Sequence, residues 1–219
     1  MTKQPAQPKR SWELAIRLFH WVLVATFAGS WITSELGTDY RDLHMQFGYV
    51  LLGLLIFRLI WGVVGGEYAR FRRFPIAPKA IWHYARTLFR RDDSEPVQGH
   101  NPLGAMMVIV MLAMLAVQVT SGLFTTDDIF YDGPYVAMVS SDVVDTMSSL
   151  HHDNFDWLKW LVVLHVCAIG FYWLAKRVNL LRPMVHAPLP ANSPSTMRIF
   201  LLALISAAVA TTIVYIPAF

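Results

Sequence analysis

Charged residues and cysteine are both scarce in this chain. Of its 219 residues, 15% are Asp, Glu, Lys or Arg and 55% are hydrophobic, whereas soluble domains carry roughly 25% charged residues. The one cysteine, Cys167, lies inside an apolar run. A disulfide within the chain and a cluster of thiolate metal ligands are therefore excluded. The scarcity of charge favours a membrane protein.

Five apolar runs are long enough to span a bilayer, which takes roughly 20 helical residues. They cover residues 15–34, 45–64, 103–124, 156–175 and 198–216, and we expect the fourth helix to begin earlier, near residue 149. No small-residue cleavage site follows the first run, so we expect it to remain as an anchor. Within the polar segment 66–102, residues 79–89 are predicted to form a short amphipathic helix at the membrane interface. The pattern predicts an all-α membrane protein.

Basic residues are distributed unequally between the two sides of the predicted spans. Fifteen of the 18 Lys and Arg residues fall in the N-terminal segment, in the second loop and between the last two spans. Because translocated loops are poor in Lys and Arg, we expect a cytoplasmic N-terminus and an external C-terminus. The basic pI follows from this topology, and no nucleic-acid partner is needed to account for it.

Histidines lie at matched depths in the predicted spans, where ionisable residues are rare and mark functional sites. His20 lies near the cytoplasmic end of the first span and His44 near the external end of the second. In the fourth helix, His151 lies at the external end, and His165 lies about 21 Å deeper at 1.5 Å per residue. The pairs His20 with His165 and His44 with His151 are therefore predicted. One such histidine alone is more often an interfacial residue, so it is the set of four at two matched depths that indicates ligands.

The helical period supports this pairing. Fourteen residues bring His165 to within about 40° of His151, whereas His152 lies about 140° from His165. His152 is therefore expected to be a surface or loop-contacting residue. Arg58 is also fourteen residues after His44, and it would either bind an anion or extend toward the headgroups. Gly48 and Gly53 lie on the same helix and would serve either helix packing or the approach of a flat ligand.

Two facing imidazoles suit a haem iron, since the porphyrin itself supplies four nitrogens. A bare zinc or copper ion would need three or four protein ligands close together. The sequence contains no Cys-x-x-Cys-His motif, so the haem would be held non-covalently. We therefore predict two b haems with His20, His44, His151 and His165 as iron ligands, and Arg58 as a candidate for a haem propionate.

Several segments resemble the bacterial di-haem cytochrome b561 family and the related b-type cytochrome subunits of nickel-iron hydrogenases. They are RLFHW at 17–21, LHMQFGYVLLGLLIFRLIWGVVG at 43–65, YARF at 68–71, GHNPLGAMMV at 99–108, LHH at 150–152 and LHV at 164–166. The resemblance implies a four-helix transmembrane bundle with two b haems on the same four histidines. It also implies electron exchange between a membrane quinone and a partner, in a bacterial inner membrane. His152 stands where the family often has an acidic residue.

The predicted organisation is a di-haem domain over residues 1–185, then a linker and an additional helix over 186–219. The leading hypothesis is electron transfer between the quinone pool and a periplasmic partner, either a c-type cytochrome or a dehydrogenase. The acidic loop 125–149 would attract a basic partner, although external loops exclude basic residues in any case. Alternatives are a superoxide:quinone oxidoreductase using Arg41 and Lys159, and a haem-free anchor. His100, Asn101 and Arg58 are candidates for a quinone site, while Asn101 could instead cap the helix that begins at Pro102.

Overall fold

The regular structure of the chain is helical. The computed structural model describes residues 12–89, 99–186, 189 and 193–216, and within these the only β pairing is a single bridge between Thr126 and Asp132. The five long helices are α1 (Leu14–Glu35), α2 (Arg41–Val64), α4 (Pro102–Gly122), α5 (Ser141–Leu174) and α7 (Thr196–Tyr215). Each is long and apolar enough to cross a membrane. The predicted all-α membrane fold is confirmed.

Short helices occupy the connections between these spans. They are η1 (Thr38–Tyr40), η2 (Phe71–Arg73), α3 (Pro78–Thr87), η3 (Val136–Met138) and α6 (Arg182–Val185). The helix predicted over residues 79–89 is therefore present as α3. The helix that carries His151 begins at Ser141, ahead of the expected start near residue 149. Its first turn carries Asp142, whose charge favours a helix N-terminus.

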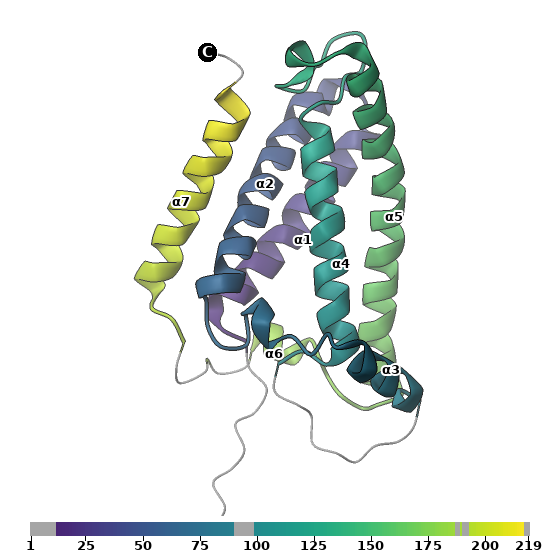
Figure 1. Cartoon of the computed structure of the whole chain (residues 1–219), viewed down its shortest axis with the longest axis vertical. Helices are drawn as coiled ribbons and strands as arrows, with labels where there is room; N and C mark the ends of the chain where they lie inside the picture. The colour runs from purple at the N-terminus through teal and green to yellow at the C-terminus, as the bar shows by residue number, and fades with distance from the viewer. Residues whose placement is uncertain (1–11, 90–98, 187–188, 190–192, 217–219) are drawn as a thin grey trace, which may run out of the picture.

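Helices α1, α2, α4 and α5 form an antiparallel bundle, with α7 beside it (Figure 1). One end of the bundle carries α3 and α6 and is here called the His20 end. The opposite end carries the loop before α2 and the loop between α4 and α5, and is called the His44 end. The predicted four-helix bundle with a fifth, C-terminal helix is confirmed.

The fifth helix packs along α2 through small residues. A Cβ placed on Gly53 would lie 3.7 Å from the Cβ of Ala210, so this glycine serves helix packing. The Tyr135 hydroxyl in the α4–α5 loop donates a hydrogen bond of 2.7 Å to the Ile213 carbonyl. The connection between bundle and fifth helix is thus both apolar and hydrogen-bonded at the His44 end.

Helix α5 packs closely on α4 but makes few contacts with α1 and α2. Only 6% of its most apolar window is buried, against 39% for α2. Cores of Leu and Val side chains fill the space among α2, α4 and α7, including Leu52, Leu115 and Val214. The space between α5 and the α1–α2 pair is where the histidines meet.

Candidate functional site

The first histidine pair joins α2 and α5 at the His44 end. The ring centroids of His44 and His151 lie 6.3 Å apart, with their planes at 85°. An iron ion held by both imidazoles would lie about 2 Å from one nitrogen of each ring, and so about 3.2 Å from each ring centre. The separation of these rings therefore fits one iron between them.

The second pair joins α1 and α5 at the opposite end. The ring centroids of His20 and His165 lie 6.5 Å apart, with their planes at 50°. This separation also matches two ligands on opposite sides of one metal. Along α5, His165 follows His151 by fourteen residues, or about 21 Å of helix rise. The structure thus brings together the pairs expected from depth, one near each end of the bundle.

At the His44 end, backbone carbonyls hold both rings in one tautomer. The Nδ1 atom of His44 lies 2.9 Å from the Ser30 carbonyl, and Nδ1 of His151 lies 3.0 Å from the Gln118 carbonyl. A carbonyl oxygen only accepts hydrogen bonds, so each Nδ1 carries the proton and each Nε2 carries a lone pair. Metal-bound histidines characteristically donate their second nitrogen in this way. The donor set therefore fits haem iron.

Helix α4 also supports His151 through an amide network. The Gln118 side-chain nitrogen donates to the His151 carbonyl at 3.0 Å, and Asn154 donates to the Gln118 side-chain oxygen at 2.6 Å. The same Gln118 nitrogen is nearly equidistant from the two ring nitrogens of His151, at 3.3 and 3.2 Å, and so lies over the ring face. A Cβ on Gly122 would lie 2.9 Å from Cε1 of this ring. The imidazole is held closely against α4.

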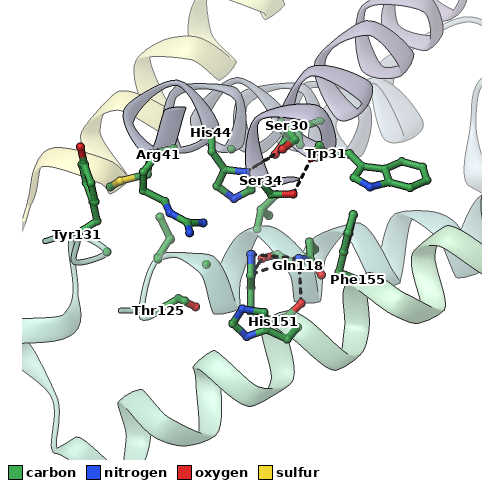
Figure 2. A pocket seen from close by; sticks show the side chains of 18 of the residues that line it. Ser30, Trp31, Ser34, Arg41, His44, Gln118, Thr125, Tyr131, His151 and Phe155 are labelled. Carbon is green, nitrogen blue, oxygen red and sulfur yellow. Dashed lines mark hydrogen bonds between the residues drawn. The ribbon is translucent and has the colours of Figure 1, made fainter. Parts of the chain in front are cut away.

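A cavity of about 500 Å³ surrounds the His44–His151 pair. Aromatic side chains, including Trp31 and Phe155, line it together with hydroxyl and charged groups such as Ser34, Thr125 and Arg41 (Figure 2). Gly48 also lines the cavity, and a Cβ there would meet nothing within 4 Å. The cavity volume falls within the roughly 300–1,000 Å³ that is typical of small-molecule sites.

Arg58 lies in α2 near the His20 end and is 3% exposed. Its guanidinium carbon lies 4.6 Å from the centroid of the Phe71 ring, a cation–π contact. The neighbouring Trp61 is fully buried and donates from Nε1 to Glu13 at 2.5 Å. Arg58 is therefore held in a buried polar cluster with η2, and its NH1 atom makes no hydrogen bond there.

The remaining candidates lie outside the two pairs. His152 is exposed and bonds the Ser148 carbonyl at 2.7 Å. Asn101 caps α4 by accepting from the Gly104 N–H at 2.7 Å, and its Nδ2 donates to the Tyr172 hydroxyl at 3.1 Å. The centroid of the His100 ring lies 4.6 Å from that of the Trp12 ring and 4.7 Å from that of the Phe74 ring. The predicted cap at Asn101 is present.

Ser30, Gln118, Asn154 and Gly122 are the supporting residues that the sequence prediction omitted. Asn154 had a detectable signal, since it follows His151 by three residues and shares its helix face. Ser30 and Gln118 accept from the rings through main-chain carbonyls, which every residue possesses, and Gln118 also contributes the side-chain amide that bonds the His151 carbonyl and Asn154. Over the part of the chain that the structure describes, no group of three or more His, Cys, Asp or Glu side chains could hold a bare metal ion.

The structure is that of a helical membrane protein in which two pairs of imidazoles from different helices face each other. The family model of the prokaryotic cytochrome b561 proteins matches residues 11–187. The chain therefore belongs to the prokaryotic cytochrome b561 family, and its five long apolar helices make it a multi-pass membrane protein.

Two curated relatives carry the description probable Ni/Fe-hydrogenase B-type cytochrome subunit. One is from Azotobacter vinelandii and the other from Azotobacter chroococcum mcd 1, and each is 31% identical over 129 residues. The matched region covers 48% of this chain and 54% of each relative, so the chain spans about half the length of the curated relatives it matches. No solved structure matches the chain.

Proposed function

We propose that the chain carries electrons across the membrane through two b haems, between the quinone pool and a periplasmic redox partner. The ligands are His20 with His165 and His44 with His151. The observation that supports this most is the separation of the rings, 6.5 and 6.3 Å, at both ends of one bundle. When bound, each haem supplies a one-electron carrier without an open coordination position.

The protein's own residues orient and enclose these carriers. The carbonyls of Ser30 and Gln118 fix the tautomer and the plane of the two imidazoles at the His44 end. Such hydrogen bonds raise the basicity of a ligand and keep it rigid. Aromatic residues of the lining, such as Phe27 and Phe155, would pack against the haem and limit reorganisation as its charge changes. Arg58 is proposed to balance a propionate of the haem at the His20 end, because its NH1 is buried without a hydrogen bond.

The proposed quinone site lies at the His20 end, near His100, Asn101 and Arg58. The Asn101 amide, the Tyr172 hydroxyl and the Tyr84 hydroxyl form a hydrogen-bonded chain, with 3.1 and 2.7 Å between successive atoms. Tyr172 follows His165 by seven residues and therefore lies on the same face of α5. Hydroxyl and amide groups at this position suit a quinone, whose reduction consumes protons as well as electrons.

The proposed partner docks at the His44 end. There the loop from α4 to α5 carries Asp127, Asp128 and Asp132, while Ile129 and Phe130 are about three-quarters exposed. An exposed apolar pair within acidic surroundings suits a redox protein with a basic docking face. The names of the Azotobacter relatives favour a periplasmic dehydrogenase of the hydrogenase kind over a c-type cytochrome.

We place the N-terminus in the cytoplasm and the C-terminus in the periplasm, on the distribution of basic residues. Residues 1–185 form the proposed di-haem domain, and 186–219 provide a linker and the helix that packs on α2. The alternative of a stand-alone superoxide:quinone oxidoreductase is less well supported. Of its two external cations, Lys159 is paired with Asp156 at 2.7 Å.

Quinol oxidation in proteoliposomes tests the proposal. A quinol added to vesicles that hold the purified protein should reduce both haems, observed as two α-band components in the optical spectrum. In the His165→Ala variant the remaining haem should be reduced at least tenfold more slowly. Equal reduction rates in both proteins would refute a quinone site at the His20 end, and fast reduction by superoxide would favour the alternative.

A further inference from the structure

Arg41 is the first residue of α2 and lines the cavity around His44 and His151. It precedes His44 by three residues, so it lies on the same helix face and about 4.5 Å nearer the bundle end. The same spacing relates Arg17 to His20 in α1. At both ends, therefore, a cation precedes the ligand histidine by one turn on the side of the nearer membrane surface.

The surroundings of Arg41 suit an anion inside the cavity. Its Nε is buried and makes no hydrogen bond with any residue that the structure describes. Figure 2 shows its side chain projecting from α2 toward the part of the cavity near Thr125. Thr125 and Tyr131 add hydroxyl groups to the same lining. A guanidinium with polar neighbours is the group that best binds a carboxylate, in a charge-assisted geometry.

The acidic residues nearby have hydrogen-bond or ion-pair partners of their own, and Asp127 interacts with Arg41 only electrostatically, without an ion pair between the two side chains. The Oδ1 atom of Asp127 accepts the backbone N–H groups of Ile129, Phe130 and Tyr131, at 3.1, 2.9 and 2.8 Å. Lys159 is the other cation of the cavity lining, and it is paired with Asp156 and lies 4.9 Å from the centroid of the Phe155 ring. Arg41 is thus the cation best placed to meet a carboxylate that enters with a ligand.

We propose that Arg41 binds the propionate carboxylates of the haem held by His44 and His151. This inference rests on the proposed function. Arg41 would orient the propionate edge of that haem toward the His44 end, where the partner would dock. Because the guanidinium offsets the propionate charge, the guanidinium favours the ferrous form of this haem. Removal of the guanidinium therefore makes the midpoint potential of this haem more negative.

The test compares full-length Arg41→Gln and Arg41→Lys with Lys159→Gln, which removes a cation from the same cavity lining. Each purified protein is titrated electrochemically, and haem transfer to apomyoglobin is timed. In Arg41→Gln we expect a lower potential for one haem only, the one that His44→Ala loses, and about ten- to a hundredfold faster transfer of it. Arg41→Lys should fall between wild type and Arg41→Gln, whereas Lys159→Gln should shift the potential less than Arg41→Gln does and keep the wild-type rate of haem transfer.

The possible outcomes separate this inference from the proposed function. Unchanged potentials and transfer rates in Arg41→Gln, with two haems bound, would overturn the role of Arg41 alone. A shift confined to the haem of His20 and His165, or an equal effect of Lys159→Gln, would overturn it as well. A wild-type protein with no haem on His44 and His151 would overturn both. If Arg41→Gln is unstable, Arg41→Lys is compared with wild type. A lower potential and faster transfer of the same haem support the role of Arg41, and wild-type values overturn it.

Discussion

Replacing Gly122 with alanine should release the haem at the His44 end while leaving the other in place. The new Cβ would lie 2.9 Å from Cε1 and 3.2 Å from Nδ1 of His151. Ordinary contact begins at 3.4 Å, so the ring must retreat by about 0.5 Å. The ring is tied to the Gln118 carbonyl on the same helix at 3.0 Å, and this bond weakens as the ring moves.

The expected magnitude follows from the loss of ligand positioning. Ligand side chains must be held within about 0.5 Å of their binding positions, so a displacement of about 0.5 Å reaches that limit. Disturbing such supporting contacts costs about 10- to 100-fold in metal affinity, or roughly 1.4–2.8 kcal/mol. Alanine is favoured over glycine inside a helix by about 0.5–1 kcal/mol, so the fold itself should not be weakened.

The assay counts haems per chain and times haem transfer to apomyoglobin. Gly170→Ala is the matched control, since it makes the same change in α5 where a Cβ would meet nothing within 4 Å. We expect faster loss of one haem in Gly122→Ala and a wild-type rate of haem loss in Gly170→Ala. Two haems retained at wild-type rates in Gly122→Ala would show that His151 is not held against α4 as described.

Three further perturbations test the cavity, the buried cluster and the acidic loop. Gly48→Leu should fill open space and halve the haem content without unfolding the protein, as measured by haem quantitation and circular dichroism. Trp61→Phe should remove the donor to Glu13 and lower stability by about 2–4 kcal/mol, measured by thermal unfolding in detergent; an unchanged melting temperature would contradict this. Backbone N–H bonds from Phe130, Tyr131 and Ile129 hold the pKa of Asp127 below its ordinary 3.8. The ionised form is favoured in the folded loop, so exchange protection of residues 129–131 should be complete above pH 3.8, be lost only as the pH falls through the lowered pKa of Asp127, and be absent in Asp127→Ala.

The histidine pairs could be predicted because depth and helical period are both written in the sequence. Hydropathy fixes where a span begins, and the spacing of fourteen residues fixes that His151 and His165 share a face. The geometry agrees with that reasoning at both ends. His152 lies outside the pairs for the same reason.

The start of α5 could not be predicted from hydropathy. Apolarity marks the boundary of the membrane, and α5 continues beyond that boundary to Ser141 through polar residues such as Asp142 and Asp145. The carbonyls of Ser30 and Gln118 also left no signal, because main-chain groups do not depend on residue type. Arg58 was placed by angle alone, whereas its long side chain extends to Phe71 in a segment beyond the helix.

Two separate histidine pairs are proposed to hold one haem each. The most direct measurement is haem stoichiometry, with reduced-minus-oxidised spectra, on the purified wild-type protein and on His44→Ala and His165→Ala. We expect two low-spin b haems in the wild type, with one lost in each variant and a different spectral component lost each time. Loss of the same haem in both variants, or a single haem in the wild type, would contradict it.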